Sequence, residues 1–420
     1  MNEPEITPRK VLIAVTCLVC SAFVPFVQAT IGPMMMLPMI NEFGWTRTQY
    51  AFATTFLFVF GSITVLIFGR MADRFGPRTI LLLGAICGGA TMLLLSQQNA
   101  QLWRLYLAFG LLGAFGSTGL GYTKIIGTLF ARHRGKALAI FGAESTIALG
   151  TLPLLTNTLN VNLGWRGTYL VYAVIMFVLT PVLFFVIRGP GLSDAARTKS
   201  LQAAPVASAP LTLLEGLTPP QIRRDRAFWL VVLTAMLGSG LNVGLTAHII
   251  AAITDKGFTQ TVAAQVLSAA TLVGLVGTLA VGFAMDYFRT ARFMSVVGLL
   301  SAIGAFLFAM ASATVGGLPL LIGGLAIQRT AMAAMPAATN YMQTRFVGMR
   351  SFGEAFAMQV VVVGIAMGIT PPLFGMIYEK YGSYAPVYWI VVGGAAVGAV
   401  VYLLLGPYRY AAKTSGPRLA

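Results

Sequence analysis

The sequence is short of charge. Charged residues make up 10% of its 420 positions, whereas hydrophobic residues make up 57%. A soluble domain averages about a quarter charged residues, so this chain has too few to cover a surface that faces water. Most of its length divides into apolar stretches of about 20 residues, each long enough to cross about 30 Å of hydrocarbon. The composition therefore predicts an all-α membrane protein.

Cysteine and recognisable catalytic patterns are scarce as well. The three cysteines, Cys17, Cys20 and Cys87, all lie inside apolar stretches, so they imply no disulfide framework. The Cys17-x-x-Cys20 spacing could be a redox or metal pair, but no partner ligand accompanies it and small packing residues are the simpler interpretation. No zinc, haem, nucleotide-loop or Ser-His-Asp pattern stands out. We therefore expect no metal, no cofactor and no enzymatic activity.

The apolar stretches predict twelve transmembrane helices. We expect them near residues 11–40, 47–68, 79–97, 102–130, 136–159, 166–188, 226–254, 260–285, 292–312, 317–343, 352–378 and 383–406. The first contains Pro25, Pro33 and Pro38, so we expect a kink or break near its outer end. Residues 189–225 are rich in Pro, Ala, Ser and Thr, which predicts a flexible cytoplasmic linker. The linker separates a six-helix bundle over residues 1–188 from a second bundle with a short cytoplasmic tail over residues 226–420.

The placement of the 28 Lys and Arg residues predicts the orientation. Segments on the side of the N-terminus hold 21 of them, and the opposite segments hold only Arg47, Arg104, Arg166, Lys256 and Lys380. Because cytoplasmic loops have an excess of Lys and Arg, both termini are expected in the cytoplasm. The net charge of +16 is explained in the same way, so it does not indicate nucleic-acid binding. We expect a monomeric, multi-pass protein of the inner membrane.

A charged loop follows the second helix. Its residues are spaced as Gly-x-x-x-Asp-Arg-x-Gly-x-Arg and are Gly69, Asp73, Arg74, Gly76 and Arg78. Gly69 would allow close helix approach and Gly76 a tight turn. Asp73 can pair with arginines or face a helix N-terminus, which would latch one conformation. This pattern resembles the signature loop of the major facilitator superfamily.

The resemblance implies two pseudo-symmetric six-helix bundles around a central cavity lined by helices 1, 4, 7 and 10. A weaker copy of the loop follows the eighth helix, where Asp286 lies 213 residues after Asp73, as an internal repeat requires. The copy lacks the central glycine. Within the superfamily, four loop segments resemble the monocarboxylate and oxalate/formate transporter branch: residues 43–49, 130–139, 164–166 and 345–350.

Several expected motifs are missing. Residues 20–25 lack the acidic, Gly- and Trp-rich signature of monocarboxylate transporters, and the eighth helix lacks an Asp–Arg pair in its membrane part. A proton-coupling scheme based on those residues therefore cannot be transferred to this chain. The fifth helix also lacks the Gly-Pro motif of many drug antiporters, which disfavours drug export.

Three charged residues fall inside predicted helices: Lys124, Glu144 and Arg329. A charge at bilayer depth costs about 2.5–3.5 kcal/mol on insertion scales, so each should be paired or face a wet cavity. Lys124 and Glu144 lie ten residues to either side of Arg134, in antiparallel helices, and so at similar depth. They could form an ion pair, either structural or functional. Glu144 is the candidate for proton coupling.

Arg329 is the candidate for binding a carboxylate, because its planar guanidinium can bind both oxygens. It lies about 24 Å from the cytoplasmic boundary, and Asn242 lies at a similar height. Gln28 lies 214 residues before Asn242, close to the repeat offset. By the resemblance, Gln28, Lys124, Asn242 and Arg329 would point into the cavity. Arg329 could instead fix helices or extend outward, and Gln28 and Asn242 could bond neighbouring helices.

The charges in the cavity leave about one positive charge uncompensated, which favours a small organic anion, either a mono- or a dicarboxylate. Without an ATP-binding motif, transport must use gradients, by proton symport or anion exchange. The alternative is a proton-coupled exporter of drugs or hydrophobic metabolites, which an apolar, methionine-rich cavity would suit. A third possibility is a membrane sensor that signals through residues 189–225. The expected partners are the anion, protons and the lipid bilayer.

Overall fold

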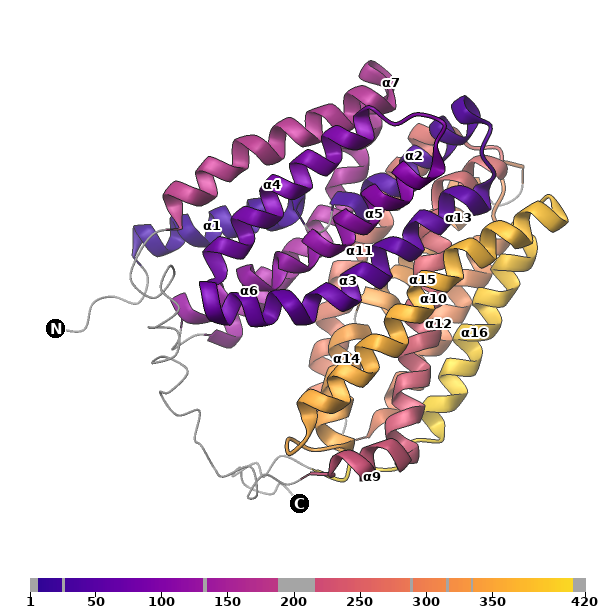
Figure 1. Cartoon of the computed structure of the whole chain (residues 1–420). Coiled ribbons are helices and arrows are strands. Elements are labelled where there is room, and N and C mark those ends of the chain that lie inside the picture. The colour runs from indigo at the N-terminus through magenta and orange to yellow at the C-terminus, as the bar shows by residue number, and fades with distance from the viewer. Residues whose placement is uncertain are drawn as a thin grey trace.

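The computed structural model describes residues 7–24, 27–130, 134–187, 216–287, 290–314, 317–333 and 335–410. These ranges are almost entirely helical (Figure 1). By length and composition, nine segments of the described chain could cross a membrane. That number is consistent with the twelve expected spans, because one long helix holds two of them and two other spans are divided into shorter helices. The all-helical prediction is therefore confirmed.

The described part of the first half contains seven α-helices. They are α1 (Pro8–Phe23), α2 (Val27–Phe43), α3 (Arg47–Phe75), α4 (Pro77–Ser96), α5 (Leu102–Gly116), α6 (Leu120–Leu129) and α7 (Arg134–Val186), with a short 3-10 helix, η1 (Ser117–Gly119), between α5 and α6. Gly164 interrupts α7 with φ 68° and ψ 174°, a conformation that glycine adopts without a steric penalty. This interruption divides α7 into the fifth and sixth expected spans.

The expected first span is divided at a different place from the prediction. α1 ends at Phe23 and α2 begins at Val27, so the break lies near the middle of residues 11–40 rather than near the outer end. Pro33 and Pro38 both lie inside α2, and the helix continues through them. Proline removes one backbone donor, but neighbouring helices in a bundle can satisfy the freed backbone groups. Of the three prolines, Pro25 falls in the sequence between α1 and α2, whereas Pro33 and Pro38 do not end a helix.

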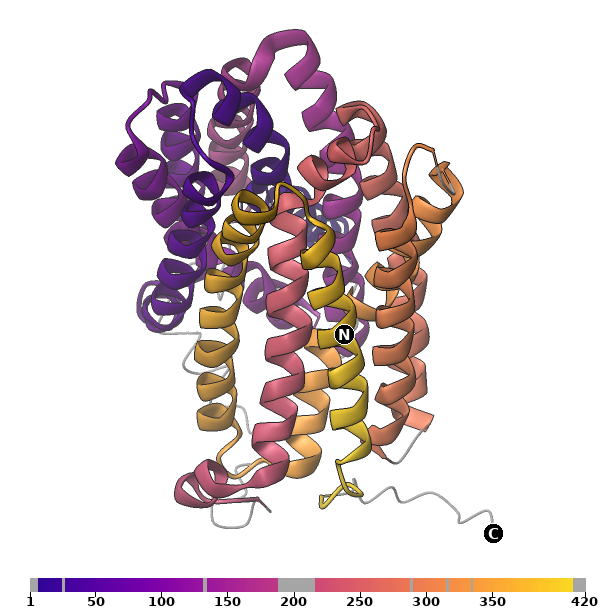
Figure 2. The same ribbon diagram turned by 90° about the vertical axis from the view of Figure 1, so that its right-hand side faces the viewer.

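A short helix, α9 (Pro219–Arg224), precedes the long helices of the second half. These are α10 (Arg226–Asp255), α11 (Gln260–Tyr287), α12 (Met294–Met310), α13 (Gly317–Ala333), α14 (Met335–Phe346), α15 (Phe352–Tyr381) and α16 (Ala385–Leu403). Figure 2 shows several of them running side by side. Most of the expected linker lies outside the described residues, and α9 falls at its end with Ile222 fully buried. The boundaries at 188 and 226 stay a prediction.

In the described part of the chain, the most extensive packing between the halves joins α3 with α15, α7 with α11, and α2 with α10. Glycines in α15 let α3 approach closely. A Cβ atom added at Gly375 would lie 2.7 Å from the Cα atom of Thr48, closer than side chains pack. The Thr55 hydroxyl donates to the Gly368 carbonyl at 2.6 Å. The contact between α3 and α15 therefore depends on the absence of side chains along one face of α15.

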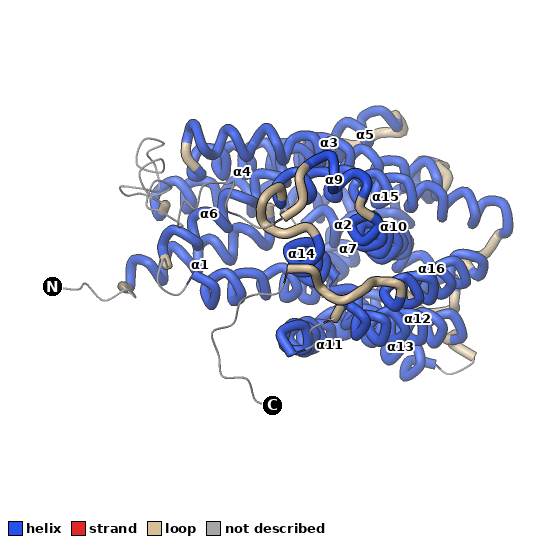
Figure 3. Tube along the Cα trace, turned by 90° about the horizontal axis from the view of Figure 1, so that it is seen from below, coloured by secondary structure: helices blue, strands red, loops and turns tan. Residues whose placement is uncertain are grey.

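The polar contacts between the halves gather on one side, where α3 begins and α10 ends. Arg47 forms an ion pair with Asp255 there, and the Gln260 amide donates to the Met34 carbonyl at 3.0 Å. Within the described ranges, α3 makes no hydrogen bond to the second half beyond Thr55. Away from this side, the ribbons of α6 and α14 lie apart (Figures 1 and 3). The halves are thus held together on what we call the Arg47 side.

Candidate functional site

A cavity of about 180 Å³ lies between the two halves. Residues of α2, α3, α5 and α7 line it from the first half, and residues of α10 and α13 line it from the second. Most of its wall is apolar or aromatic, and its polar lining residues are Tyr50, Thr54, Asn242, Thr246 and Arg329. A concave apolar site with a few converging polar groups is typical of small-molecule binding.

Arg329 supplies the positive charge of this cavity. Its Nη2 atom donates to the Thr246 hydroxyl at 2.9 Å, while its buried Nε atom has no hydrogen-bond partner among the described residues. No ion pair between described residues includes Arg329. Gly274 of α11 lets α13 pack closely, because a Cβ atom there would lie 3.3 Å from the Arg329 carbonyl carbon. The guanidinium is thus held by Thr246 and still has an unused donor, Nε.

Asn242 lies one helical turn before Thr246, so both face the same side of α10. Its Oδ1 atom is buried and has no hydrogen-bond partner in the described part of the chain. A buried polar atom without a partner costs about 1–3 kcal/mol, and such atoms are uncommon in folded proteins. A ligand that pairs with both Arg329 and Asn242 would recover part of that cost.

Aromatic side chains of the first half form the facing wall. The Tyr50 hydroxyl donates to the Gly32 carbonyl at 2.8 Å, and the ring meets Phe109 edge-on with centroids 6.0 Å apart. Phe58 and Leu57 continue this wall along α3. A ligand in the cavity would thus have a cationic group on one side and apolar surface on the other. Both halves contribute to the site, so their relative movement would change it.

Two of the predicted site residues lie elsewhere in this conformation. The Lys124 amino group, on α6, donates to the Ala72 carbonyl at 3.5 Å, near the end of α3. Glu144 is buried on α7 beside Ser21 of α1, and its Oε1 atom has no hydrogen-bond partner in the described ranges. Neither residue lines the cavity, and no ion pair between described residues links the two. The structure therefore brings Arg329 and Asn242 together but not Lys124.

The remaining predicted residues are described only in part. The side chains of Gln28, Asp73 and Asp286 lie outside the described residues. Gly76 has φ 83° between α3 and α4, the tight turn that the sequence predicts. A Cβ atom at Gly69 would meet no heavy atom within 4 Å, so Gly69 is not at a close helix contact here. The role of Gly69 in close helix approach therefore stays a prediction.

The rest of the signature loop is a packed helix end. Arg74 is exposed, and Arg78 donates from Nη2 to the Phe184 carbonyl at 2.6 Å with its guanidinium 4.4 Å from the Phe184 ring. The loop thus connects α4 to the end of α7 within the first half. A latch role for Gly69, Asp73, Arg74, Gly76, Arg78 and Asp286 stays a prediction.

Sequence reasoning missed several residues that the structure brings together. Thr246 could have been found, because it lies one turn after Asn242 on the same helix face. Tyr50 and Phe109 carry no such signal, since apolar aromatic residues occur on most helices of the chain. Asp255 was missed because its partner, Arg47, lies 208 residues away.

Comparison with known proteins identifies the class to which this fold belongs. The profile of the Major Facilitator Superfamily matches residues 17–318 and 250–419. The chain therefore belongs to this superfamily and is a multi-pass membrane transporter.

Individual relatives agree with that assignment at low identity. Monocarboxylate transporter 13 of Bos taurus is 27% identical over 407 residues, which cover 94% of this chain and 86% of the relative. The uncharacterised transporter YcxA of Bacillus subtilis is 30% identical over 39% of this chain and 41% of its own length. The multidrug resistance protein MdtG of Salmonella choleraesuis is 34% identical over 33% of each chain. The chain thus spans less than half of YcxA and MdtG. Its resemblance to the monocarboxylate branch is confirmed.

Solved structures show the same fold. A bacterial homologue of the human lysosomal transporter Spinster, in an inward-facing and occupied conformation, superposes with a TM-score of 0.73 at 17% identity. The superposition covers 95% of this chain and 97% of that one. A mutant of the nucleoside transporter NupG gives a TM-score of 0.74 at 14% identity, over 93% of this chain and 99% of that one.

Proposed function

We propose that the protein is a secondary active transporter that moves a small organic anion, a mono- or dicarboxylate, across the inner membrane by alternating access. The observation that carries this proposal is the Arg329 guanidinium, which lies in a cavity between the halves with a free donor and no carboxylate partner among the described residues. A buried charge of this kind needs an anion or water to offset its desolvation. A substrate carboxylate meets that need.

Binding would use the polar and apolar walls together. The carboxylate accepts hydrogen bonds from Arg329, while Thr246 holds the guanidinium from the other side at 2.9 Å. Asn242 bonds a second polar group of the substrate, and Tyr50 and Phe109 contact its hydrocarbon part. A charge-assisted hydrogen bond contributes about 1.5–3 kcal/mol, so Arg329 would supply a large share of the affinity of a small ligand.

The charge distribution suggests which way the cavity opens. The segments on the Arg47 side hold few Lys and Arg residues, so this side is proposed to face outward and the diverging ends of α6 and α14 to face the cytoplasm. Transport then requires the halves to rock about the cavity, separating on the Arg47 side and closing on the other.

Proton symport is the proposed source of energy. Glu144 is a buried carboxylate in the first half with one oxygen unpaired, beside Ser21. Protonation would remove its charge and so change the cost of keeping it buried. Lys124 and Gln28 remain candidates for substrate contact in another conformation. Anion exchange would need no proton site.

Export of drugs or hydrophobic metabolites is the second candidate. The apolar wall of the cavity, including Leu57, Phe58 and Leu149, favours it, and the relation to MdtG adds support. An apolar cationic or neutral drug would leave Arg329 unpaired, however, so its binding would not offset the desolvation cost of that buried charge.

An uptake screen in proteoliposomes separates these functions. Labelled mono-, di- and aromatic carboxylates and neutral hydrophobic compounds are supplied with and without an imposed proton gradient. Carboxylate uptake that rises with the inward proton gradient supports symport, and uptake driven only by a trapped second anion supports exchange. Transport of neutral compounds with no carboxylate uptake would contradict the proposal.

A further inference from the structure

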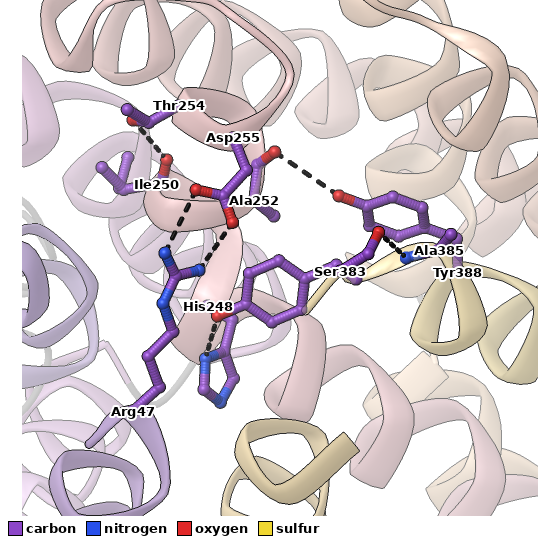
Figure 4. A network of polar contacts seen from close by, with 10 residues as sticks. Arg47, His248, Ile250, Ala252, Thr254, Asp255, Ser383, Ala385 and Tyr388 are labelled. Carbon is purple, nitrogen blue, oxygen red and sulfur yellow. Dashed lines mark hydrogen bonds and ion pairs between the residues drawn. The ribbon is translucent and has the colours of Figure 1, made fainter. Parts of the chain in front are cut away.

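A bidentate ion pair connects the two halves on the Arg47 side. Arg47 begins α3 and Asp255 ends α10, and their side chains meet with Nη1–Oδ2 at 2.7 Å and Nη2–Oδ1 at 3.1 Å (Figure 4). The side chain of Arg47 is only 13% exposed and that of Asp255 32% exposed. Paired planar geometry and partial burial are the conditions under which such an ion pair contributes more than an ordinary surface pair.

Further groups of the second half surround the Arg47 guanidinium. It lies 3.7 Å from the centroid of the Tyr378 ring and 5.2 Å from that of Tyr384. The backbone N–H of the next residue, Thr48, donates to the Glu379 carboxylate at 2.9 Å. One short stretch of the first half is therefore held by an aspartate, a glutamate and two aromatic rings of the second half.

A buried histidine fixes the second-half side of this contact. His248 is 0% exposed, and its Nε2 atom lies 2.9 Å from the Pro371 carbonyl. Since a carbonyl only accepts, Nε2 carries the hydrogen, and Nδ1 accepts from the Tyr384 hydroxyl at 2.8 Å. His248 thus ties α10 to α15 and to the turn before α16. Tyr384, held in this way, faces both His248 and Arg47.

This cluster is adjacent to the cavity between the halves. Tyr50, three residues after Arg47, lines the cavity, and so does Ala247, next to His248. The contact is asymmetric. The second half contributes two carboxylates and two aromatic rings, and the first half contributes the Arg47 guanidinium and the Thr48 backbone N–H.

We propose that Arg47, Thr48, Asp255, Tyr378 and Glu379, which we call the Arg47 gate, close the cavity on this side and must separate in each transport cycle. The gate favours the conformation seen here, because its contacts exist only while the halves meet on the Arg47 side. Its strength sets the fraction of molecules with the cavity open to the opposite side. The gate acts on any substrate and does not depend on the identity of the anion.

Accessibility of a cysteine in the cavity tests the gate without substrate. A reporter is introduced as Thr54→Cys, and a membrane-impermeant maleimide is added on the Arg47 side of oriented vesicles. Native Cys17 and Cys20 are 0% exposed, and the chain without the reporter gives the background. Neutralising either partner, as Arg47→Gln or as the nearly isosteric Asp255→Asn, should raise the labelling rate of the reporter about tenfold.

A variant with both substitutions distinguishes loss of one shared ion pair from two independent effects on the labelling rate. If the pair acts as a unit, Arg47→Gln combined with Asp255→Asn should label at about the rate of either single variant. The proposal would be overturned if the fold increases of the two single variants multiplied in the double variant. It would also be overturned if both single variants were labelled at the parental rate. Asp255→Asn alone decides the test if Arg47→Gln does not fold.

The chain offers a matched control on the same side of the molecule. Arg166 and Glu42 form an ion pair of 2.6 Å, and both belong to the first half. Arg166→Gln removes a charge at a similar place but no contact between the halves, so the labelling rate should stay at the parental value. An equal increase in this control would show that loss of any charge on this side exposes the cavity, and the gate would be refuted.

Discussion

Replacing Arg329 with lysine tests whether geometry as well as charge matters in the cavity. Lysine keeps the positive charge but loses the planar fork. In the structure the guanidinium bonds Thr246 at 2.9 Å through Nη2 and keeps Nε free for a ligand. An ammonium group in that place would have to give up either the threonine or part of the carboxylate.

The expected cost is about one charge-assisted hydrogen bond, or about 1.5–3 kcal/mol. That corresponds to a roughly tenfold to hundredfold increase in the Kd of a carboxylate substrate. The Kd is measured by titration calorimetry on the purified protein, once the screen has identified a substrate. Arg224→Lys is the matched control, because Arg224 is exposed on α9, outside the cavity, and its change should leave the Kd unaltered.

Unchanged affinity in a folded Arg329→Lys protein would refute the bidentate geometry. The thermal unfolding temperature is measured first, because a misfolded variant would lose both substrate affinity and thermal stability. A large drop in affinity at constant stability is the predicted outcome.

Three further predictions follow from single side chains. Asn242→Leu removes a buried acceptor that has no partner, so it should lower carboxylate affinity while leaving the unfolding temperature unchanged or higher, as calorimetry and a thermal scan would show. Gly113→Ala should destabilise the first bundle by several kcal/mol and shift the cavity wall, because its Cβ atom would lie 2.0 Å from the Leu57 carbonyl oxygen; a normal unfolding temperature would contradict this. Burial alone would raise the pKa of Glu42, but hydrogen bonds from Trp165 and Arg166 and the charge of Arg166 outweigh it and hold that pKa below its ordinary value. The stability that Glu42 contributes is therefore present above the ordinary pKa of a glutamate and lost as pH falls through the lowered pKa, and Glu42→Gln should flatten that part of the acid unfolding profile.

The helices could be predicted well from the sequence and their rotation could not. Long apolar runs locate spans because each must cross the same thickness of hydrocarbon. The 1.5 Å rise per residue gives depth, and it placed Arg329 and Asn242 at one height. Depth alone does not tell which way a side chain points around the helix axis.

Lys124 illustrates this limit. It was expected in the cavity because it lies on the fourth span, but its amino group instead meets the Ala72 carbonyl. The 3-10 helix η1 precedes it, over Ser117–Gly119. Because a 3-10 helix has three residues per turn, it changes the direction in which the side chains after it point around the helix axis. No sequence signal marks such a change. The Arg47–Asp255 pair was beyond prediction for another reason, since two chain segments 208 residues apart meet only in the folded molecule.

Competition between a carboxylate and its neutral amide tests the central claim most directly. Uptake of a labelled carboxylate into proteoliposomes is inhibited with the unlabelled acid or with the amide of the same size, in the parental protein and in Arg329→Gln. The acid should inhibit at least about tenfold more strongly than the amide in the parent, and the two should inhibit almost equally in Arg329→Gln. Equal preference for the acid in both proteins would contradict the account, because the anion would then be recognised by groups other than Arg329.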